Sequence, residues 1–293
     1  MEYNICAIIV AYNCDEKILL GIENIKKQVH GIVIIDNGSN EKSLQILKNI
    51  NGQSGIEIIY NKSNMGIAYA LNQGVKYAQS NGFSWVVTLD QDSIATKDMI
   101  KNMLQVYNSL SQGEKLNTFS LVPVHVEENT YVEKPYESVE VKFEEILTDI
   151  TSGNLIKISL FDKVGYFEEK LFIDCVDHEF CLRISKSGYK ILKVHNSILI
   201  HNLGDTHIRK VFGKSIQATN HSFIRRYYTS RNRQYVWKLY EKTFPQWVKN
   251  DKKAAAKDAV IIVLFESDKF LKVKMLIKGY FDYKKKKFGQ LKL

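Results

Sequence analysis

The chain has 293 residues, 45% of them apolar and 25% charged, which fits a soluble globular protein with one large domain or one domain and an appendage. Three prolines are too few for Pro-rich linkers, and no apolar run approaches the roughly 20 residues of a membrane-spanning helix. The net charge of +9 arises in residues 221–293, which hold 19 Lys and Arg against 6 Asp and Glu, whereas residues 1–220 carry a net charge of −4.

Strands and helices alternate through the first part of the chain. Runs of β-branched apolar residues predict strands, and apolar residues at helical spacing predict the helices between them. The expected strands are 3–12, 31–36, 56–60 and 84–89, and the expected helices are 15–27, 41–50 and 64–81. This order predicts a Rossmann-like α/β domain with a mostly parallel central sheet and helices on both faces.

The rest of the chain is less regular. We expect a helix near 97–107, strands or sheet edges at 118–126, 131–143 and 150–158, a helix at 177–187 that ends before Gly188, and a strand at 189–200. From residue 220 onwards the pattern is helical and rich in Lys, Tyr, Trp and Phe. We therefore predict one α/β domain over residues 1–220 and a basic helical region over residues 221–293.

Two acidic residues follow the strand in "WVVTLDQDS", the stretch from residue 85 to residue 93. Asp90 and Asp92 would stand at the carboxyl end of the strand, which is where ligands bind in open α/β sheets. Two neighbouring carboxylates repel each other unless a cation or a proton lies between them, so a divalent cation would suit this turn. The alternative is a capped turn, with Asp92 or Ser93 as the N-cap of the next helix.

The turn after the first strand reads "AYNCDEK" and lacks the GxGxxG pattern of a dinucleotide site, and the sequence contains no P-loop pattern. A nucleotide would therefore bind by another arrangement. Asp36, at the end of the second strand, can accept a hydrogen bond from the imide N–H of a pyrimidine base. Its alternative role is that of a turn residue in "DNGS".

Asn64 and Gly66 lie just before the third helix, in "NKSNMGIAYALNQG". The free N–H groups of a helix N-terminus attract an anion, and glycine permits close approach of the backbone. An N-cap asparagine followed by a flexible glycine is an equally good interpretation.

"FIDCVDHEFCLR" (172–183) contains three carboxylates. Asp174 and Asp177 are three residues apart and would share a helix face. A carboxylate beside an apolar wall can have a raised pKa and serve as a general base. The alternative is an N-cap at Asp177 and a salt bridge from Glu179 to Arg183.

His201 ends the strand in "ILIHNLGD". A single histidine is more often a packing or surface residue than a ligand, and it gains importance only if it approaches Asp92. An oxygen and nitrogen set of that kind suits Mn²⁺ or Mg²⁺ bridging a diphosphate.

Together these segments resemble the inverting GT-A glycosyltransferases of family two, and within it the bacterial rhamnosyltransferase-like branch. The resemblance covers roughly residues 4–235. It rests on "AYN", "DNGS", "NMGIAYALNQG", "LDQDS", "SGNLI", "FIDCVDHEFCLR", "HNLGD" and "YYTSRN", which occur in this order. Each motif is weak alone, but the ordered set is specific.

The resemblance implies a role for each matching residue. Asp92, with Asp90, matches the DxD element that ligates a divalent cation, Mn²⁺ or Mg²⁺, on the sugar-nucleotide diphosphate, and His201 matches a histidine that completes this metal site. Asp177 matches the catalytic base, while Glu179 and Asp174 would lie on the acceptor side or support it. The nucleotide-sugar pocket would comprise Ala11, Tyr12, Asn13, Asp36, Asn64, Gly66, Asp90, Gln91 and Arg231.

The forms "DQDS" and "FIDxVDxEFCLR" favour rhamnosyl transfer from dTDP-L-rhamnose, with a glycan on a polyprenyl diphosphate lipid as acceptor, in bacterial surface polysaccharide synthesis. One alternative is the same fold with a UDP-hexose or UDP-galactofuranose donor. Another is a non-catalytic partner that binds a sugar nucleotide or glycan, although such a protein would not need the base Asp177.

The basic C-terminal region suggests a further partner. "KFLKVKMLIKGYFDYKKKKF" (269–288) mixes apolar side chains with lysines, as in helices that lie on an anionic membrane surface. A solvated lysine face, with the apolar side packed on the body of the protein or on a second subunit in a homodimer, is equally compatible. No motif supports nucleic-acid binding. The four cysteines form no CxxC pair and the chain starts in a strand, so we expect a cytoplasmic protein at the inner face of the plasma membrane.

Overall fold

The computed structural model describes residues 3–128, 131, 142–201, 207–211, 214–218 and 220–292. The chain divides into two compact units. The first comprises residues 1–168 and 180–202, and the second comprises residues 169–179 and 203–293. Residues 169–179, which belong to the predicted α/β domain, thus group with the C-terminal region.

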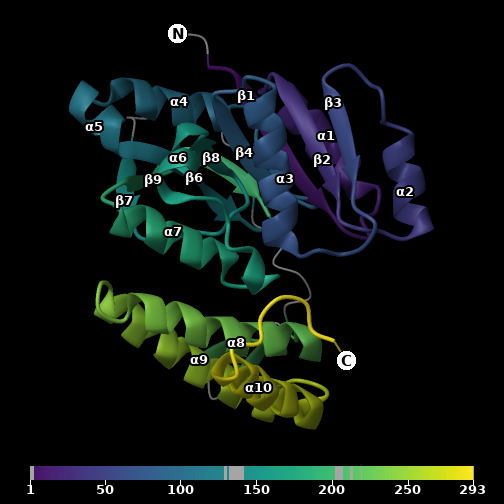
Figure 1. The fold of residues 1–293 in the computed structure, drawn as a ribbon, viewed down its shortest axis with the longest axis vertical. Coiled ribbons are helices and arrows are strands. Elements are labelled where there is room, and N and C mark those ends of the chain that lie inside the picture. Colours follow the sequence, from purple (N-terminus) through teal and green to yellow (C-terminus); the bar gives the residue numbers. More distant parts are fainter. Residues whose placement is uncertain are drawn as a thin grey trace. The chain divides into compact units, whose positions relative to one another are not determined.

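A nine-stranded sheet forms the centre of the first unit (Figure 1). Its strands are β1 (Ile5–Ala11), β2 (Gly31–Asp36), β3 (Ile56–Tyr60), β4 (Trp85–Asp90), β5 (Ile94–Ala95), β6 (Thr118–Val126), β7 (Phe143–Ile146), β8 (Asn154–Lys157) and β9 (Lys190–Ile200). The order is β3-β2-β1-β4-β8-β6-β9-β5, and β7 also pairs with β9. β1–β4, β6 and β9 share one direction, and β5, β7 and β8 run against them. The sheet is therefore mostly parallel, as predicted.

Helices surround this sheet. They are α1 (Lys17–Lys26), α2 (Glu41–Lys48), α3 (Ile67–Ser80), α4 (Met99–Ser109), α5 (Gln112–Asn117), α6 (Ser159–Val164) and α7 (Val176–Lys186), with a short 3-10 turn, η2 (Glu169–Leu171), before α7. Because successive strand residues point to opposite faces, Ile5, Ala7 and Ile9 of β1 join a core with α1, α2 and α4. On the other face Ile8 meets α3, where a Cβ on Gly74 would lie 2.3 Å from Cγ2 of Ile8. Both faces are thus covered, as in parallel sheets generally.

The predicted alternation of strands and helices up to β4 is confirmed, with boundaries shifted by a few residues. The two-residue strand β5 and the short helices α5 and α6 were not predicted. Of the predicted strand 131–143, residues 132–141 lie outside the described part of the chain, and β7 begins at its last residue, Phe143.

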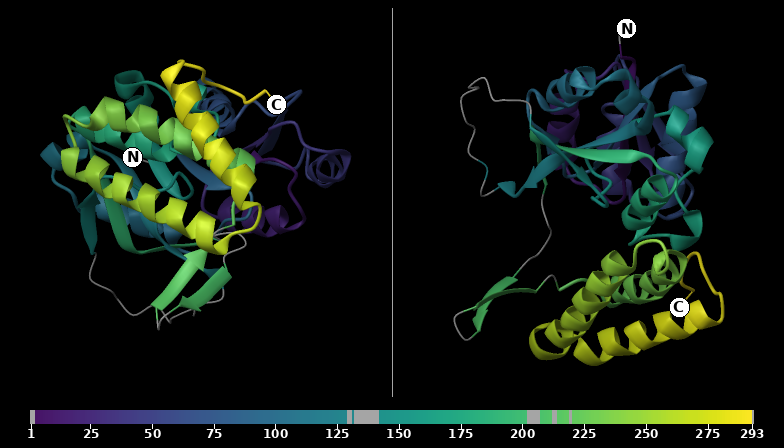
Figure 2. Two further views of the ribbon diagram at one scale, coloured as in Figure 1. Left: turned by 90° about the horizontal axis from the view of Figure 1, so that it is seen from below. Right: turned by 90° about the vertical axis from the view of Figure 1, so that its left-hand side faces the viewer.

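The second unit is mainly helical, as predicted for the C-terminal region. It contains the hairpin β10 (His207–Val211) and β11 (Lys214–Ala218). Three helices follow, α8 (Phe223–Tyr240), α9 (Pro245–Phe265) and α10 (Lys269–Lys284) (Figure 2). Tyr227 and Tyr228 of α8 pack with Met275 of α10. The two helices approach so closely that a Cβ on Gly279 would lie 2.4 Å from the carbonyl oxygen of Tyr227.

Two findings bear on the environment of the chain. In the described residues, the helices lack a stretch that is both apolar enough and long enough for a bilayer crossing. Cys6, Cys14, Cys175 and Cys181 are buried free thiols, and burial raises the pKa of Cys6 to about 12. A thiol with so high a pKa remains protonated at neutral pH and is a poor nucleophile.

Candidate functional site

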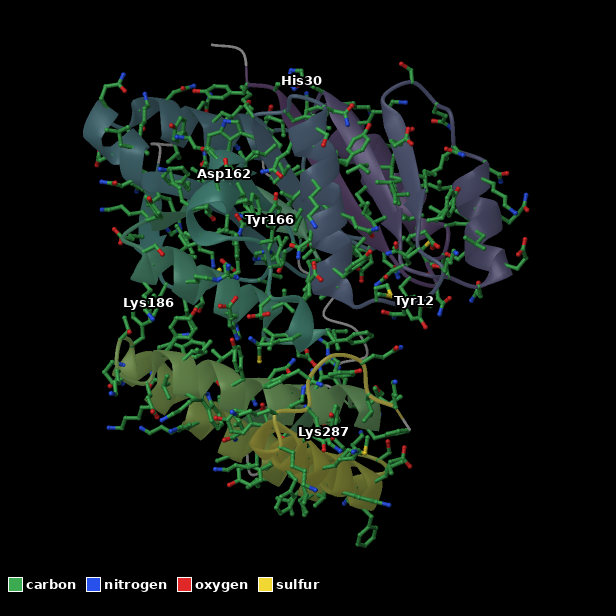
Figure 3. The ribbon with its side chains drawn as sticks, in the orientation of Figure 1. Tyr12, His30, Asp162, Tyr166, Lys186 and Lys287 are labelled. Atoms are coloured by element: carbon green, nitrogen blue, oxygen red, sulfur yellow. The ribbon has the colours of Figure 1, made fainter. Side chains whose placement is uncertain are left out.

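Predicted site residues gather where the parallel strands end. Figure 3 shows Tyr12, just after β1, at the edge of the sheet opposite His30, which lies just before β2. Asp36 and Asp90 are the last residues of β2 and β4, on either side of β1. The register pairs Ala11 of β1 with Asp36 and Val10 with Asp90, so three predicted residues meet at one sheet edge.

Asp90, Asp92 and His201 form the one cluster in the described residues that could hold a metal ion. One ligand atom from each lies within 4.8 Å of those of the other two, and all three residues are half-buried. The strand pairing explains how His201 reaches this turn: β5 follows Asp92 directly and pairs antiparallel with the end of β9, with Ile94 opposite Ile200. The backbone N–H of His201 also donates to the carbonyl of Val126, at the end of β6.

Two buried serines connect the members of this cluster. Ser93 Oγ lies 2.7 Å from Ser152 Oγ and 3.0 Å from His201 Nδ1. Ser152 Oγ also accepts a hydrogen bond of 3.1 Å from the backbone N–H of Asp90. The two hydroxyl groups therefore fix the turn and the imidazole ring relative to each other.

Ser152 is held in turn by its own surroundings. Gly153 adopts a φ of +82° and donates its N–H to the carbonyl of Thr88 in β4. A Cβ at Gly153 would lie 2.6 Å from Pro123, so this turn requires glycine. His125 Nε2 lies 2.8 Å from the carbonyl oxygen of Ser152, and burial lowers the pKa of His125. A neutral His125 with its proton on Nε2 can donate to this carbonyl.

The side chains present fit a hard divalent cation. Two carboxylates and an imidazole supply two oxygen ligands and one nitrogen ligand, a set suited to Mn²⁺ or Mg²⁺ that leaves positions for other oxygen atoms. With Nδ1 of His201 hydrogen-bonded to Ser93, Nε2 remains for the ion, and a ligand histidine usually donates its second N–H in this manner.

Asp36 is almost fully buried, with an exposed fraction of 1%. Its Oδ2 accepts hydrogen bonds of 3.3 Å from the N–H groups of Gly38 and Ser39, so the turn role left open by the sequence is present. Its Oδ1 is buried without a hydrogen-bond partner among the described residues. A buried acceptor without a partner carries a desolvation cost, which an N–H brought by a ligand would offset.

The turn after β1 is tied to its neighbours through its backbone. Tyr12 N–H donates to Oε1 of Gln91 over 2.8 Å, and Asn13, at a φ of 51°, accepts from the N–H of Asn40. Ala11 accepts from the N–H of Asn37. Tyr12 is 45% exposed at this edge and can contact a ligand.

Asn64 shapes the turn before α3. Its Oδ1 accepts from the N–H of Gly66 over 2.9 Å and lies 3.2 Å from Nδ2 of Asn37. Gly66 is the N-cap of α3 with a φ of 89°. The N-cap of α3 is thus Gly66 rather than Asn64, and no side chain caps this helix. Asn64 holds the turn before the helix. A role of Asn64 in nucleotide binding stays a prediction.

Asp177 and its acidic neighbours belong to the second unit. Asp177 lies in the first turn of α7, half-buried, and its Oδ1 accepts from the N–H of His178. Glu179 is buried, and its Oε1 accepts a hydrogen bond of 3.0 Å from the hydroxyl of Tyr240. Arg183, the alternative partner of Glu179, donates to the carbonyl of Val164.

The sequence profile of Glycosyl transferase family 2 matches residues 6–164. The chain belongs to this family. It is also 31% identical over 243 residues to the dTDP-rhamnosyl transferase RfbF of Shigella flexneri, covering 79% of each chain. An uncharacterized glycosyltransferase of Haemophilus influenzae is 21% identical over 282 residues, which is 92% of this chain and 98% of that one.

Solved structures agree with the predicted GT-A fold. GalNAc-T7 with UDP, GalNAc and Mn²⁺ has a TM-score of 0.62 at 14% identity, over 97% of this chain and 56% of that one. Residues 1–349 of TarS from S. aureus, in complex with UDP-GlcNAc, have a TM-score of 0.55 at 14% identity, over 96% of this chain and 72% of that one. This glycosyltransferase thus spans little more than half of the GalNAc-T7 chain.

The structure gives Arg231 of this glycosyltransferase other partners than the predicted diphosphate. Its exposed fraction is 1%, and its guanidinium donates to the carbonyls of Lys170, Leu171 and Gly289. These hydrogen bonds give Arg231 a structural role in the second unit. Its predicted place near the diphosphate stays a prediction.

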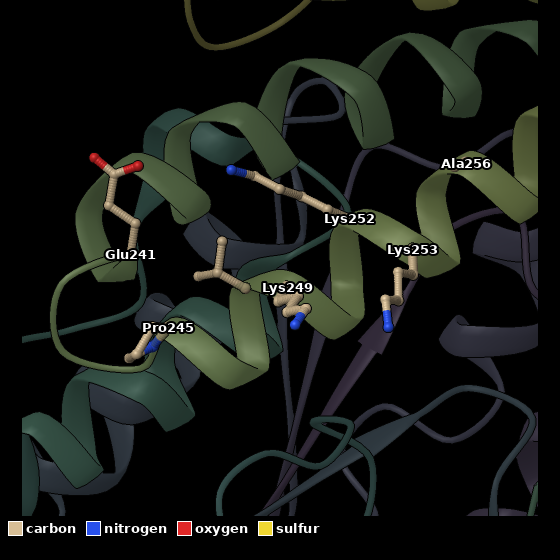
Figure 4. Close-up of a pocket in the computed structure, with 7 residues that line it drawn as sticks. Glu241, Pro245, Lys249, Lys252, Lys253 and Ala256 are labelled. Atoms are coloured by element: carbon tan, nitrogen blue, oxygen red, sulfur yellow. The ribbon is translucent and has the colours of Figure 1, made fainter.

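A hollow of about 520 Å³ lies in the second unit and contains none of the predicted site residues (Figure 4). It is lined by Glu241, Pro245, Val248, Lys249, Lys252, Lys253 and Ala256. Glu241, the one carboxylate in this lining, pairs with Lys238, and the lining contains no histidine and no second carboxylate. The hollow therefore offers no metal-ligand set comparable with the Asp90 cluster.

Sequence reasoning missed two residues that support the metal cluster, Ser152 and His125. Ser152 begins "SGNLI", one of the motifs of the family resemblance, but its role beside the DxD turn depends on the antiparallel pairing of β8 with β4. His125 lies in a strand whose pattern gives no sign of a polar contact. Ser93 was considered only as an N-cap.

Proposed function

We propose that this glycosyltransferase is a metal-dependent inverting enzyme that transfers L-rhamnose from dTDP-L-rhamnose to a lipid-linked glycan. The observation that carries the proposal is the convergence of Asp90, Asp92 and His201 at the carboxyl edge of the parallel strands. This edge is the usual ligand site of open α/β sheets. A divalent ion held there would neutralise the charge that develops on the departing diphosphate.

The protein side chains have separate tasks in this reaction. Asp36 accepts the imide N–H of the thymine, and Tyr12 contacts the nucleotide at the sheet edge. Asp177 takes the proton of the acceptor hydroxyl. At the same time the hydroxyl oxygen bonds to C1 of the sugar, and the bond from C1 to the diphosphate oxygen breaks. A single displacement inverts the anomeric centre, so no covalent sugar–enzyme intermediate is formed.

Two observations favour dTDP-L-rhamnose as the donor. The 31% identical relative is a dTDP-rhamnosyl transferase, and it spans most of this chain. The stretch from "FID" to "EFCLR" resembles the corresponding motif of the rhamnosyltransferase-like branch. A UDP-hexose or UDP-galactofuranose is the second candidate, because similar folds were solved with UDP and UDP-GlcNAc.

A thermal-shift panel distinguishes these donors. The protein is heated with dTDP-L-rhamnose, UDP-sugars or GDP-sugars, each with Mn²⁺, with Mg²⁺ or with EDTA. A ligand that binds only the folded state raises Tm, so we expect the largest rise with dTDP-L-rhamnose and a metal ion. A larger rise in Tm with a UDP-sugar would identify that sugar nucleotide as the donor instead of dTDP-L-rhamnose. No rise in Tm with any donor would contradict the proposed function.

We further propose that one face of the C-terminal helices lies on an anionic membrane surface. Phe270, Lys274, Ile277 and Phe281 follow helical spacing along α10, and Phe270 is 95% exposed. Further exposed apolar residues of this region are Val260, Val263, Leu264, Leu271 and Tyr280. Exposed apolar side chains among lysines match the interface of an anionic bilayer better than the apolar interface of a stable dimer.

Co-sedimentation with vesicles tests this face. We expect binding to phosphatidylcholine vesicles that contain phosphatidylglycerol, weaker binding to phosphatidylcholine alone, and weaker binding at high salt. The double variant Phe270→Ser and Phe281→Ser should lose this binding, whereas Leu116→Ser, at an exposed site on α5, should retain it. Variants that leave vesicle binding intact but convert a dimer to a monomer would contradict the proposal.

A further inference from the structure

The loop that leads into α7 has an unusual backbone. Phe172, Asp174 and Cys175 have φ values of 67°, 65° and 60°, and Asp177 follows in the first turn of α7. Non-glycine residues with positive φ are uncommon and energetically unfavourable, so they persist only where surrounding contacts enforce them. The contacts around this loop are therefore informative.

Asn232 of α8 supplies the first set of contacts. Its side chain has an exposed fraction of 0%, and its Nδ2 lies 2.8 Å from the carbonyl oxygen of Leu171, 2.8 Å from that of Ile173 and 2.9 Å from that of Asp174. One amide group thus holds three carbonyls of the loop.

Arg231 extends this set. Its Nε donates to Oδ1 of Asn232 over 3.0 Å, which orients the amide. Its Nη2 donates to the carbonyls of Lys170 and Leu171 over 3.3 Å and 3.0 Å. The guanidinium also lies 4.9 Å from the ring centroid of Tyr228. A planar group with several fixed donors is well suited to hold carbonyls from different directions.

The carboxylate of Asp174 is held from the same helix. Its Oδ1 accepts from Nε of Arg225 and its Oδ2 from Oγ1 of Thr229, each over 3.0 Å. Arg225, Thr229 and Asn232 are spaced by four and three residues, so they share one face of α8. We call Arg225, Thr229, Arg231 and Asn232 the α8 clamp.

The C-terminal segment closes the arrangement. Gly289 donates its N–H to the carbonyl of Lys170 over 2.8 Å and accepts from Nη1 of Arg231 over 2.7 Å. Leu291 donates its N–H to the hydroxyl of Tyr228 over 2.7 Å. This segment, yellow in Figure 1, returns to α8 after α10 and ties its own backbone to the loop.

We infer that the α8 clamp and the C-terminal segment are positioning elements for Asp177, which fix the loop so that its carboxylate stands at the start of α7 ready to accept a proton. The inference rests on the proposed function, because it takes Asp177 as the base. An ordinary helix start needs only one capping side chain. Here several donors hold four of the five residues 170–174, in a stretch of chain that contains backbone angles of high energy. The C-terminal region is then part of the catalytic apparatus.

The test compares three variants. Asn232→Ala removes the amide from the loop, and a chain that stops after Lys287 lacks the contacts of Gly289 and Leu291 but keeps every helix. Lys238→Ala, at an exposed site on the same helix, is the matched control. For each variant we would measure kcat, KM for the donor, the dissociation constant of dTDP with Mn²⁺, and hydrogen exchange of residues 169–177.

Both loop variants should lower kcat by about 100-fold, since a small misplacement of a catalytic group has an effect of this size. The donor KM and the affinity for dTDP should remain at the values of the wild type, and exchange at 169–177 should become faster. If the loop contacts had a purely structural role, the variants would have a lower Tm but would not combine a lower kcat with an unchanged donor KM. Should Asn232→Ala not fold, the shortened chain decides the question alone.

A kcat equal to that of Lys238→Ala in the folded loop variants would overturn the inference. Asp177→Asn separates this failure from that of the proposed function. If Asp177→Asn is inactive while the loop variants keep full kcat, only the positioning role is wrong. If Asp177→Asn retains wild-type kcat, the assignment of the base itself is wrong, whatever the loop variants do.

Discussion

Ser93 Oγ lies 3.0 Å from Nδ1 of His201, although 108 residues separate the two in the chain. The contact exists because β5, which begins one residue after Ser93, pairs with the last residues of β9. Through Ser152 the same hydroxyl reaches the backbone N–H of Asp90. The geometry of the candidate metal site therefore depends on two serines that need not touch the ion.

Ser93→Ala should weaken Mn²⁺ binding while leaving the fold intact. The partners that orient a ligand histidine typically contribute about 10- to 100-fold in metal affinity, and we expect a loss in this range. Isothermal titration of Mn²⁺ into the protein measures it. Ser84→Ala, just before β4 at its other end, is the control and should bind Mn²⁺ as the wild type does. An unchanged affinity of Ser93→Ala would show that the hydrogen bond does not position His201.

Asp177→Asn should abolish sugar transfer and leave donor binding nearly intact. Asparagine has almost the same size as aspartate but cannot accept the proton of the acceptor hydroxyl at neutral pH. Single-turnover transfer and the dissociation constant of dTDP with Mn²⁺ measure the two properties separately. An equal loss of both would argue against a role as base and for a role in donor binding.

Gly279→Ala should destabilise the second unit. Its Cβ would lie 2.4 Å from the carbonyl oxygen of Tyr227, so α8 and α10 would have to separate, and overpacking of this kind costs roughly 1–3 kcal/mol. Gly113→Ala in α5 is the matched control, because its Cβ meets no atom within 4 Å and alanine favours the helix by about 0.5–1 kcal/mol. Urea unfolding measures both. Equal stability of the two variants would mean that the helices are not closely packed at Gly279.

His221 should make stability depend on pH below neutrality. Burial first, and then the charges of Arg225 and Arg226, lower its pKa from the usual 6.5 to about 4, while Asp174 and Glu266 act in the opposite direction. Between pH 6.5 and 4 the unfolded chain binds a proton at this residue that the folded chain does not, so its contribution is complete above pH 6.5 and is lost as the pH falls.

Thermal unfolding between pH 7 and pH 4.5 measures this effect. His221→Gln should lose less Tm over this range than the wild type. A decrease in Tm of His221→Gln as large as that of the wild type would contradict the expectation.

Local sequence patterns were sufficient to predict the strands and helices in the first part of the chain. β1 to β4 and the helices between them show clear periodicity, and Asp36 and Asp90 end their strands as the apolar runs imply. Ordered motifs then placed Asp92 and His201 in one site, and the structure brings them together with Asp90.

Features that depend on pairing between distant segments were not accessible in this way. β5 has two residues, Ile94 and Ala95, too few for a period, yet it brings His201 to the DxD turn. Arg231 carries a charge that suggests an anion, but its buried position among loop carbonyls follows from the packing of α8. The positive φ values at Phe172 and Cys175 occur in residues that rarely adopt them, so nothing in the sequence signals this loop.

The most direct test of the account is the affinity for dTDP, measured by isothermal titration with Mn²⁺ and with EDTA, in the wild type and in Asp92→Ala. We expect Mn²⁺ to tighten dTDP binding by at least about 10-fold in the wild type. A tenfold change in affinity corresponds to about 1.4 kcal/mol of binding free energy. In Asp92→Ala this dependence should disappear. A wild-type affinity that is the same with Mn²⁺ and with EDTA would contradict the claim that Asp90, Asp92 and His201 hold an ion that binds the donor diphosphate.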